Sequence, residues 1–167
     1  TGKTTVVAYT SVADVGVIGN KASVDGQAYG GLSHSIGYAL TEDYHDVKKH
    51  GNMAGAGIPQ IQEIPDDFNL IYLENPRSRA PYGSSGCSEL FQSSGHVAVL
   101  NAIKDACGVR IFEIPALPAK VKAGLDAIAR GEDLTPPPYF FGTDFYDEID
   151  NIVANPVGKA TGPLQAE

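Results

Sequence analysis

A glycine- and serine-rich stretch at residues 81–96, PYGSSGCSELFQSSGH, carries the side chains best suited to chemistry. Its small residues lead to Glu89, and an apolar pattern with helical spacing follows. A turn that opens into a helix presents backbone N–H groups to an anion. The stretch therefore suggests an anion-binding loop with Glu89 projected into the site. The alternative is a capped helix, in which Ser84, Ser85 or Ser88 is the N-cap and Glu89 is a first-turn residue.

Other catalytic arrangements have less support in the sequence. Cys87 would be a nucleophile candidate near His96, but one cysteine in a loop is more often a packing residue. The strand–elbow–helix context of a serine nucleophile and the Rossmann glycine fingerprint are both absent. The four histidines show no metal-ligand spacing, and His45 and His50 lie in a polar segment where we expect solvated side chains. His34 could be a site residue or a hydrogen-bonded core histidine.

Composition limits the class of protein and its partners. The chain has 167 residues with 43% hydrophobic content, which suits one domain or a part of one. Its net charge of −8 argues against a nucleic-acid or anionic-membrane surface. No apolar run reaches the ~20 residues of a membrane span, and no signal peptide is evident. Because the chain starts inside an expected strand, we expect a fragment or a subunit. Cys87 and Cys107 are expected to be free thiols, and iron–sulfur clusters would lie on other polypeptide.

The order of strand and helix patterns predicts an α+β or α/β layered unit. One expected helix is rich in glycine, and each glycine costs about 1 kcal/mol relative to alanine. Close packing against another backbone or against a ligand would explain this cost. The expected elements are a strand at 4–12, the glycine-rich helix at 28–40, a strand at 69–74, a helix at 97–107 ended by Gly108, a strand at 109–114 and a helix from Pro118 ended by Gly131.

The segment 132–167 differs in composition from residues 1–131, and we expect it to be a separate acidic-aromatic docking tail. Three prolines precede YFFGTDFYDEIDNIV, which is more aromatic than a disordered tail. We therefore expect an extended arm that docks on another surface, with disorder after about Asn155. The aromatic residues that suggest docking are Tyr139, Phe140, Phe141, Phe145 and Tyr146.

Three motifs, taken in order, resemble the C-terminal part of the molybdenum-cofactor domain of the xanthine oxidase family. They are DGQAYGGLSHSIGYALTE, YLENPRSRAPYGSSGCSE and NAIKDACGVRIFEIPALPAKV, within roughly residues 5–130. The variants GSSGCSE and GGLSHSIG resemble the bacterial aldehyde oxidoreductases, which use molybdopterin cytosine dinucleotide. The resemblance implies that residues 1–131 form part of a layered, mixed sheet-and-helix molybdopterin-binding domain of the α+β class.

The resemblance also implies an activity and a site. The activity is oxidation of aldehydes to carboxylic acids with water-derived oxygen at a molybdenum–pterin centre. Glu89 would be the general base, and the cofactor would supply the molybdenum ligands, so no protein ligand to the metal is expected. Two 2Fe–2S clusters would lie on the remainder of the enzyme. The residues implied to contact the cofactor are Gly19, Asn20, Gln27, Ser84, Ser85, Gly86, Cys87 and Ser88.

The implied partners are the N-terminal iron–sulfur and molybdenum domains of the same enzyme, an aldehyde and an electron-acceptor protein. A homodimer of the full enzyme in the cytoplasm is expected, with no nucleic acid and no membrane bound. One alternative is a non-catalytic subunit that docks through its aromatic tail and shapes a neighbouring active site. A free-standing acidic ligand-binding domain is a further alternative.

Overall fold

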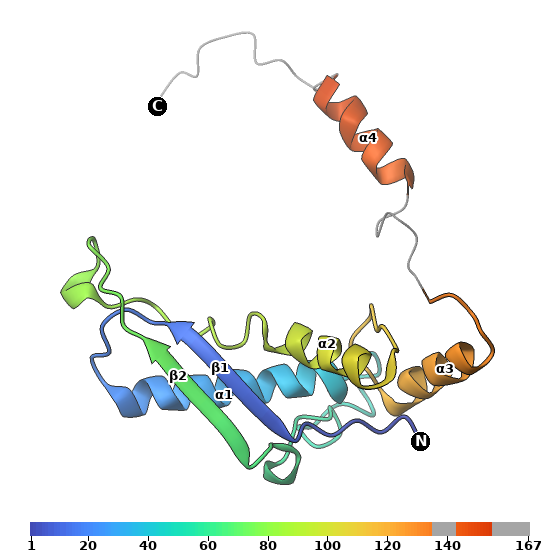
Figure 1. Cartoon of the computed structure of the whole chain (residues 1–167), viewed down its shortest axis with the longest axis horizontal. Coiled ribbons are helices and arrows are strands. Elements are labelled where there is room, and N and C mark those ends of the chain that lie inside the picture. The colour runs from blue at the N-terminus through green and yellow to red at the C-terminus, as the bar shows by residue number, and fades with distance from the viewer. Residues whose placement is uncertain (135–142, 155–167) are drawn as a thin grey trace. The chain divides into compact units, whose positions relative to one another are not determined.

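The computed structural model describes residues 1–134 and 143–154, which belong to two units, Thr1–Leu134 and Thr135–Glu167. The first unit combines helices with a small parallel sheet, which confirms the α+β class (Figure 1). Its elements are β1 (Ala8–Asp14), α1 (Lys21–Leu40), the 3₁₀ helix η1 (Ile61–Glu63), β2 (Asp67–Leu73), the 3₁₀ helix η2 (Pro81–Gly83), α2 (Gly95–Cys107) and α3 (Pro118–Ala129).

Strand β1, helix α1 and strand β2 form a parallel crossover unit. The strands pair in register from Ala8 opposite Asp67 to Asp14 opposite Leu73. Parallel neighbours need a long connection, and α1 with the loop after it supplies that connection. Because the strands are parallel, both end at the same edge of the sheet. The segments that follow them, 15–20 and 74–88, therefore start close together.

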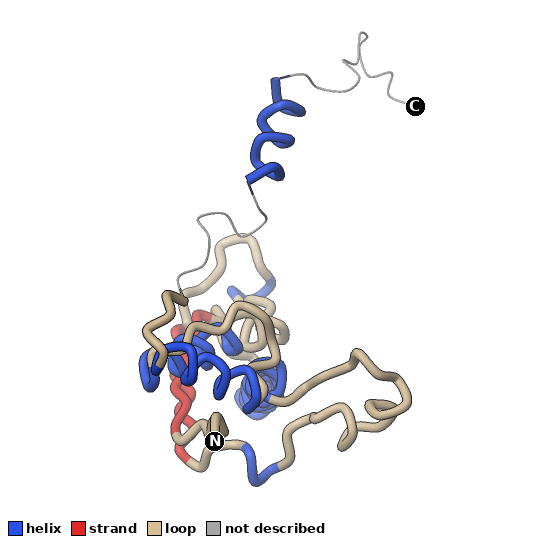
Figure 2. The backbone as a smooth tube through the Cα atoms, turned by 90° about the vertical axis from the view of Figure 1, so that its right-hand side faces the viewer, coloured by secondary structure: helices blue, strands red, loops and turns tan. Residues whose placement is uncertain are grey.

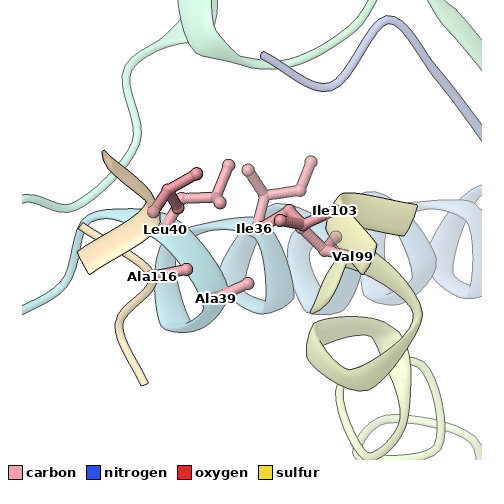
Figure 3. Packing of buried hydrophobic residues seen from close by; sticks show 7 residues of the cluster. Ile36, Ala39, Leu40, Val99, Ile103 and Ala116 are labelled. Atoms are coloured by element: carbon pink, nitrogen blue, oxygen red, sulfur yellow. The ribbon is translucent and has the colours of Figure 1, made fainter. Parts of the chain in front are cut away.

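Two hydrophobic clusters hold the unit together. Figure 3 shows the first cluster, in which Ile36 and Leu40 of α1 pack with Val99 and Ile103 of α2. Fully burying a side chain of this size stabilises the fold by about 1.5–3 kcal/mol. The second cluster contains Ala13, Val15, Ala28, Leu32 and Phe91, so it joins the sheet, α1 and the glycine-serine loop.

The glycines of α1 have more than one role. A Cβ on Gly31 would lie 3.0 Å from Phe91 Cβ, and one on Gly37 would lie 2.6 Å from Pro59 Cδ. These two glycines therefore permit close packing of the chain on itself. A Cβ on Gly30 would meet nothing within 4 Å, so this glycine faces open space. Close self-packing therefore explains part of the glycine content of α1, and the space beside Gly30 stays open.

The predicted strand at 109–114 is wrong, because this segment is irregular in the structure. Val109 is buried, and Ala116 N–H donates to Ala39 O at 2.6 Å, so the segment is fixed by packing and by the end of α1. Its β-rich composition fits a half-buried surface as well as it fits a strand. The other expected elements are present, with shifts of several residues at their ends.

A long loop connects α1 to η1 and includes the expected polar segment 41–52. Figure 2 shows it in tan, projecting from the helices before it enters the short helix η1. Two hydrogen bonds close its base. Thr41 Oγ1 donates to Gly57 O at 2.6 Å, and Asp43 N–H donates to Ala56 O at 3.0 Å.

The described part of the second unit is helix α4 (Thr143–Ala154). The extended arm expected from the sequence is therefore a helix over these residues, and Ile149, Ile152 and Val153 have the spacing of one helix face, which explains it. Residues 139–141 and the chain after Asn155, expected to dock and to be disordered respectively, lie outside the described residues. Of the helices that are described, none combines the length and apolar character that a bilayer crossing requires.

Candidate active site

The glycine-serine loop is bonded to the connection between β1 and α1. Ser85 N–H donates to Val15 O at 3.1 Å, and Ser84 Oγ donates to Val17 O at 2.8 Å. Gly16 forms an isolated antiparallel bridge with Ser84. These contacts place Ser84 and Ser85 at the carboxyl edge of the sheet, next to the turn that leads into α1.

Asp14, the last residue of β1, anchors the chain that precedes this loop. Its Oδ2 accepts hydrogen bonds from Asn75 Nδ2 at 2.9 Å and from Arg77 Nη1 at 3.0 Å. Hydrogen bonds from Asn75, Arg77 and the Gly16 N–H hold the pKa of Asp14 well below its usual range. Arg77 N–H also donates to Gly83 O at 3.0 Å. The loop is therefore supported by an ionised carboxylate at the strand end.

The loop leaves several hydrogen-bond donors available. Among the described residues, none of the backbone N–H groups of Gly86, Cys87, Ser88 and Glu89 has an acceptor. A Cβ on Gly86 would meet nothing within 4 Å, so the space beside these groups is open. Successive N–H groups of this kind can hold the oxygens of an anionic group. The donor set therefore fits a phosphate-bearing cofactor.

Both cysteines are free thiols, as the sequence predicts. Cys87 is half-buried and packs against the cluster that contains Phe91 and Leu32. This packing makes Cys87 part of the loop's wall, and the structure gives no sign of a Cys87–His96 pair.

The helix after the loop starts two residues before the expected 97–107 and six residues after Glu89. Helix α2 begins at Gly95, and residues 88–94 form a turn in which the N–H groups of Gln92 and Ser93 donate to Glu89 O at 3.2 and 3.1 Å. Both interpretations of the sequence, the anion-binding loop and the capped helix, have a helix that opens directly at this loop, and on that point both are wrong. Glu89 is not in a first helical turn, and Ser84, Ser85 and Ser88 are not N-caps. Buried Phe91 anchors the turn, and the run Ser93–Gly95 is poor in helix-forming residues.

Glu89 is exposed and borders a hollow of about 290 Å³. Residues from α1, from the turn and from α2 line it: Tyr38, Glu89, Gln92, Ser93 and His96. The Tyr38 and His96 rings have centroids 6.1 Å apart, and Gln92 Nε2 lies 3.1 Å from His34 Nδ1. His34 is therefore an exposed neighbour of this hollow and not a core histidine.

Sequence reasoning missed four residues of this hollow. One signal was available, because His34 and Tyr38 are four positions apart and so share a face of the expected helix. The places of Gln92, Ser93 and His96 depend on how the turn at 88–94 packs against α1, and the spacing of residues along the chain does not show that packing. Two further hollows, of about 360 and 370 Å³, contain none of the residues predicted to bind the cofactor.

The remaining predicted residues lie at the start of α1. Gly19, Asn20 and Gln27 are all exposed, and Asn20 caps the helix by accepting the Ser23 N–H at 2.9 Å. Gln27 and Tyr38 are eleven positions apart in α1, which is about 16 Å along a helix axis. The structure therefore does not bring this group to Glu89. Gly19, Asn20 and Gln27 instead lie toward the other end of α1. Their contact with a cofactor stays a prediction.

Comparisons with known proteins bear on the family and the fold. Residues 1–65 match a family described as a molybdopterin cofactor-binding domain. Over 127 residues the chain is 50% identical to an aldehyde oxidoreductase of Megalodesulfovibrio gigas, covering 76% of this chain and 14% of that protein. Over 128 residues it is 34% identical to the large subunit of nicotine 6-hydroxylase from Paenarthrobacter nicotinovorans, covering 72% and 16%.

Solved structures show the same fold. The aldehyde oxidoreductase of Desulfovibrio gigas matches with a TM-score of 0.74 and 49% identity, over 75% of this chain and 14% of that chain. Quinoline 2-oxidoreductase from Pseudomonas putida 86 matches with a TM-score of 0.65 and 27% identity, over 73% and 16%. The chain thus spans about one seventh of the length of these relatives. The matches confirm the resemblance seen in the motifs: over residues 1–65 the chain matches a molybdopterin cofactor-binding domain, and over three quarters of its length it is similar to part of molybdenum enzymes of the xanthine oxidase family.

Proposed function

We propose that this protein oxidises aldehydes to carboxylic acids with oxygen derived from water, and that Glu89 is the general base. The observation that carries the proposal is the position of Glu89. It borders a hollow and directly follows three residues whose N–H groups lack an acceptor among the described residues. The 50% identity to an aldehyde oxidoreductase supports aldehydes as the substrate class.

The donor set supports binding of molybdopterin cytosine dinucleotide, an elongated and anionic group. The N–H groups of Gly86, Cys87 and Ser88 would hold anionic oxygens, and the hydroxyl of Ser85 would face the same group. Gly19, Asn20 and Gln27 would contact the nucleotide end, because they lie about 16 Å or more from Tyr38 along α1. When bound, the molybdenum–pterin group supplies the redox centre that takes two electrons from the substrate.

The chain's own residues manage the proton and the substrate. The overall change converts RCHO and H₂O into RCOOH, two protons and two electrons. The Glu89 carboxylate accepts one of these protons from the water, which makes the oxygen a better nucleophile toward the carbonyl carbon. Tyr38 and His96 flank the hollow, and Gln92 is held by His34, so these side chains orient the substrate beside Glu89.

Other parts of the polypeptide would carry the electrons away from the substrate. Two 2Fe–2S clusters on other parts of the polypeptide would pass the electrons to an acceptor protein, because Cys87 and Cys107 are too few to ligate a cluster. We propose the cytoplasm as the location and a homodimer of the full enzyme.

Replacement of Glu89 by glutamine tests the general base. Glu89→Gln is expected to retain molybdenum and cytosine nucleotide but to lose turnover by about 10²–10⁴-fold, the range for a lost general base. The control is Glu113→Gln, which removes a carboxylate whose side chain is 88% exposed and outside the hollow. Near-wild-type turnover in a metal-replete Glu89→Gln protein would refute the assignment.

The alternative is a non-catalytic subunit that docks on a neighbouring active site. Exposed apolar residues of α4, Ile149, Ile152 and Val153, are the observation that favours it. Molybdenum and cytosine nucleotide analysis of the intact assembly separates the two functions. A non-catalytic subunit would tolerate Glu89→Gln with no change in the turnover of the assembly.

A further inference from the structure

The long loop between α1 and η1 brings three metal-ligating side chains together. Asp43, His45 and His50 each offer one ligand atom, and these atoms all lie within 4.8 Å of one another. The His45 and His50 rings meet edge to face with centroids 5.0 Å apart, and His45 Nδ1 lies 2.5 Å from Asp43 Oδ1. From this geometry we propose that Asp43, His45 and His50 form a binding site for Zn²⁺ or a similar late first-row divalent cation.

The loop backbone holds the three residues in place. Asp43 N–H donates to Ala56 O at 3.0 Å, and His50 N–H donates to Asp46 O at 2.8 Å. Asp46 Oδ1 accepts the N–H of Lys48 at 3.0 Å, which tightens the turn between the two histidines. Much of the ordering that a metal site requires is therefore already present without the ion.

The ligand types select the class of metal. Two imidazole nitrogens and one carboxylate oxygen suit Zn²⁺ and its neighbours, whereas Mg²⁺ and Ca²⁺ take oxygen ligands. Three protein ligands leave the fourth tetrahedral position for a water molecule.

Only side-chain movement is needed to close the site. Zn²⁺ bonds of about 2.0–2.2 Å place two tetrahedral ligands roughly 3.4 Å apart. The ligand atoms lie within 4.8 Å of one another, so the wider separations must shrink by at most about 1.4 Å. Asp43 Oδ1 and His45 Nδ1, now 2.5 Å apart, must separate by about 0.9 Å if both atoms bind the ion. The His45 side chain is 74% exposed, so it can turn when its contact with Asp43 Oδ1 opens. His50 Nδ1 accepts the Asp46 N–H at 3.2 Å, a long hydrogen bond that a coordinate bond would replace at little cost.

Zinc binding to the intact protein tests the proposal. After chelator treatment and dialysis against micromolar free Zn²⁺, the wild-type protein is expected to hold one more zinc per chain than the His45→Ala/His50→Ala double variant. The matched control is His34→Gln, which removes an exposed histidine outside the cluster and is expected to keep the ion. Equal zinc content in the wild type and the double variant would overturn the site.

X-ray absorption at the zinc edge gives a readout that does not depend on the variants. The site predicts two imidazole nitrogens among ligands at about 2.0–2.1 Å. Zinc surrounded by oxygen alone would contradict it. Circular dichroism of the double variant should match the wild type, because His45 is exposed and His50 is only partly buried. The result is independent of Glu89, so either proposal can fail without the other.

Discussion

Replacement of Gly95 by alanine should loosen the contact between the first turn of α2 and α1. A Cβ at this position would lie 2.5 Å from Ser35 Oγ and 2.7 Å from Tyr9 Oη. Ordinary contacts between such atoms are about 3.5 Å or longer, so the neighbours must move by nearly 1 Å. Ser35 is fully buried, and its Oγ lies 3.1 Å from the carbonyl oxygens of both Gly31 and Gln92. The movement therefore disturbs the turn that carries Glu89.

The net effect follows from two opposing contributions. Overpacking a dense site costs about 1–3 kcal/mol. Alanine gains at most about 1 kcal/mol over glycine in a helix, and less at a first helical position. We expect Gly95→Ala to lower the free energy of local opening by about 1–2 kcal/mol. Gly30→Ala is the matched control, because its Cβ meets nothing within 4 Å and only the propensity gain remains.

Hydrogen–deuterium exchange on the intact protein measures this difference. Each 1.4 kcal/mol corresponds to a tenfold change in protection, so amides in residues 95–103 should lose protection by about 5- to 30-fold in Gly95→Ala. Gly30→Ala should leave these amides at or above wild-type protection. If Gly95→Ala were as protected as the wild type, the close contact of Gly95 with Ser35 would be refuted.

Two further predictions concern the polar contacts around the sheet. Asp14 has a folded-state pKa below the unfolded value of about 3.9, so it adds stability above that pH and loses it as the pH falls toward the folded value. Asp14→Asn should therefore lower the urea midpoint at pH 7 more than near pH 2.5, where part of the contribution is already lost, and an equal loss at both would contradict this assignment. Tyr72→Phe removes a hydrogen bond of 2.8 Å from Tyr72 Oη to Asp25 Oδ1 and should cost about 0.5–1.5 kcal/mol by thermal denaturation. Tyr29→Phe is its control, because the Tyr29 hydroxyl has no hydrogen bond among the described residues, and equal losses in both variants would show that the bond adds nothing.

The sequence predicted the parts of the fold that carry strong local signals. The apolar spacing of Leu32 and Ile36 indicated α1, and Gly108 indicated the end of α2, where it adopts φ 81°. The separate turn at 88–94, which keeps Glu89 outside α2, could not be predicted in the same way. It depends on Phe91 entering the core and on Gly95 fitting against Ser35, and both are tertiary contacts that spacing along the chain does not show.

The candidate site could be predicted only in part, because it too depends on contacts between segments that are far apart in the sequence. The glycine-serine loop and Glu89 were identified from residue types and from the resemblance. Tyr38 and His96 come from two helices that meet only in the folded chain, so no local pattern connects them to Glu89. The same limit applies to His45 and His50, whose spacing resembles no metal motif.

A crystal structure of the cofactor-loaded protein, with molybdenum located by its anomalous signal, would decide whether Glu89 lies beside the metal. If Glu89 is the general base, one of its carboxylate oxygens lies within a few ångströms of the metal, and the N–H groups of Gly86–Ser88 are directed at the cofactor. A molybdenum position remote from this loop, with Glu89 facing solvent in the loaded protein, would contradict it.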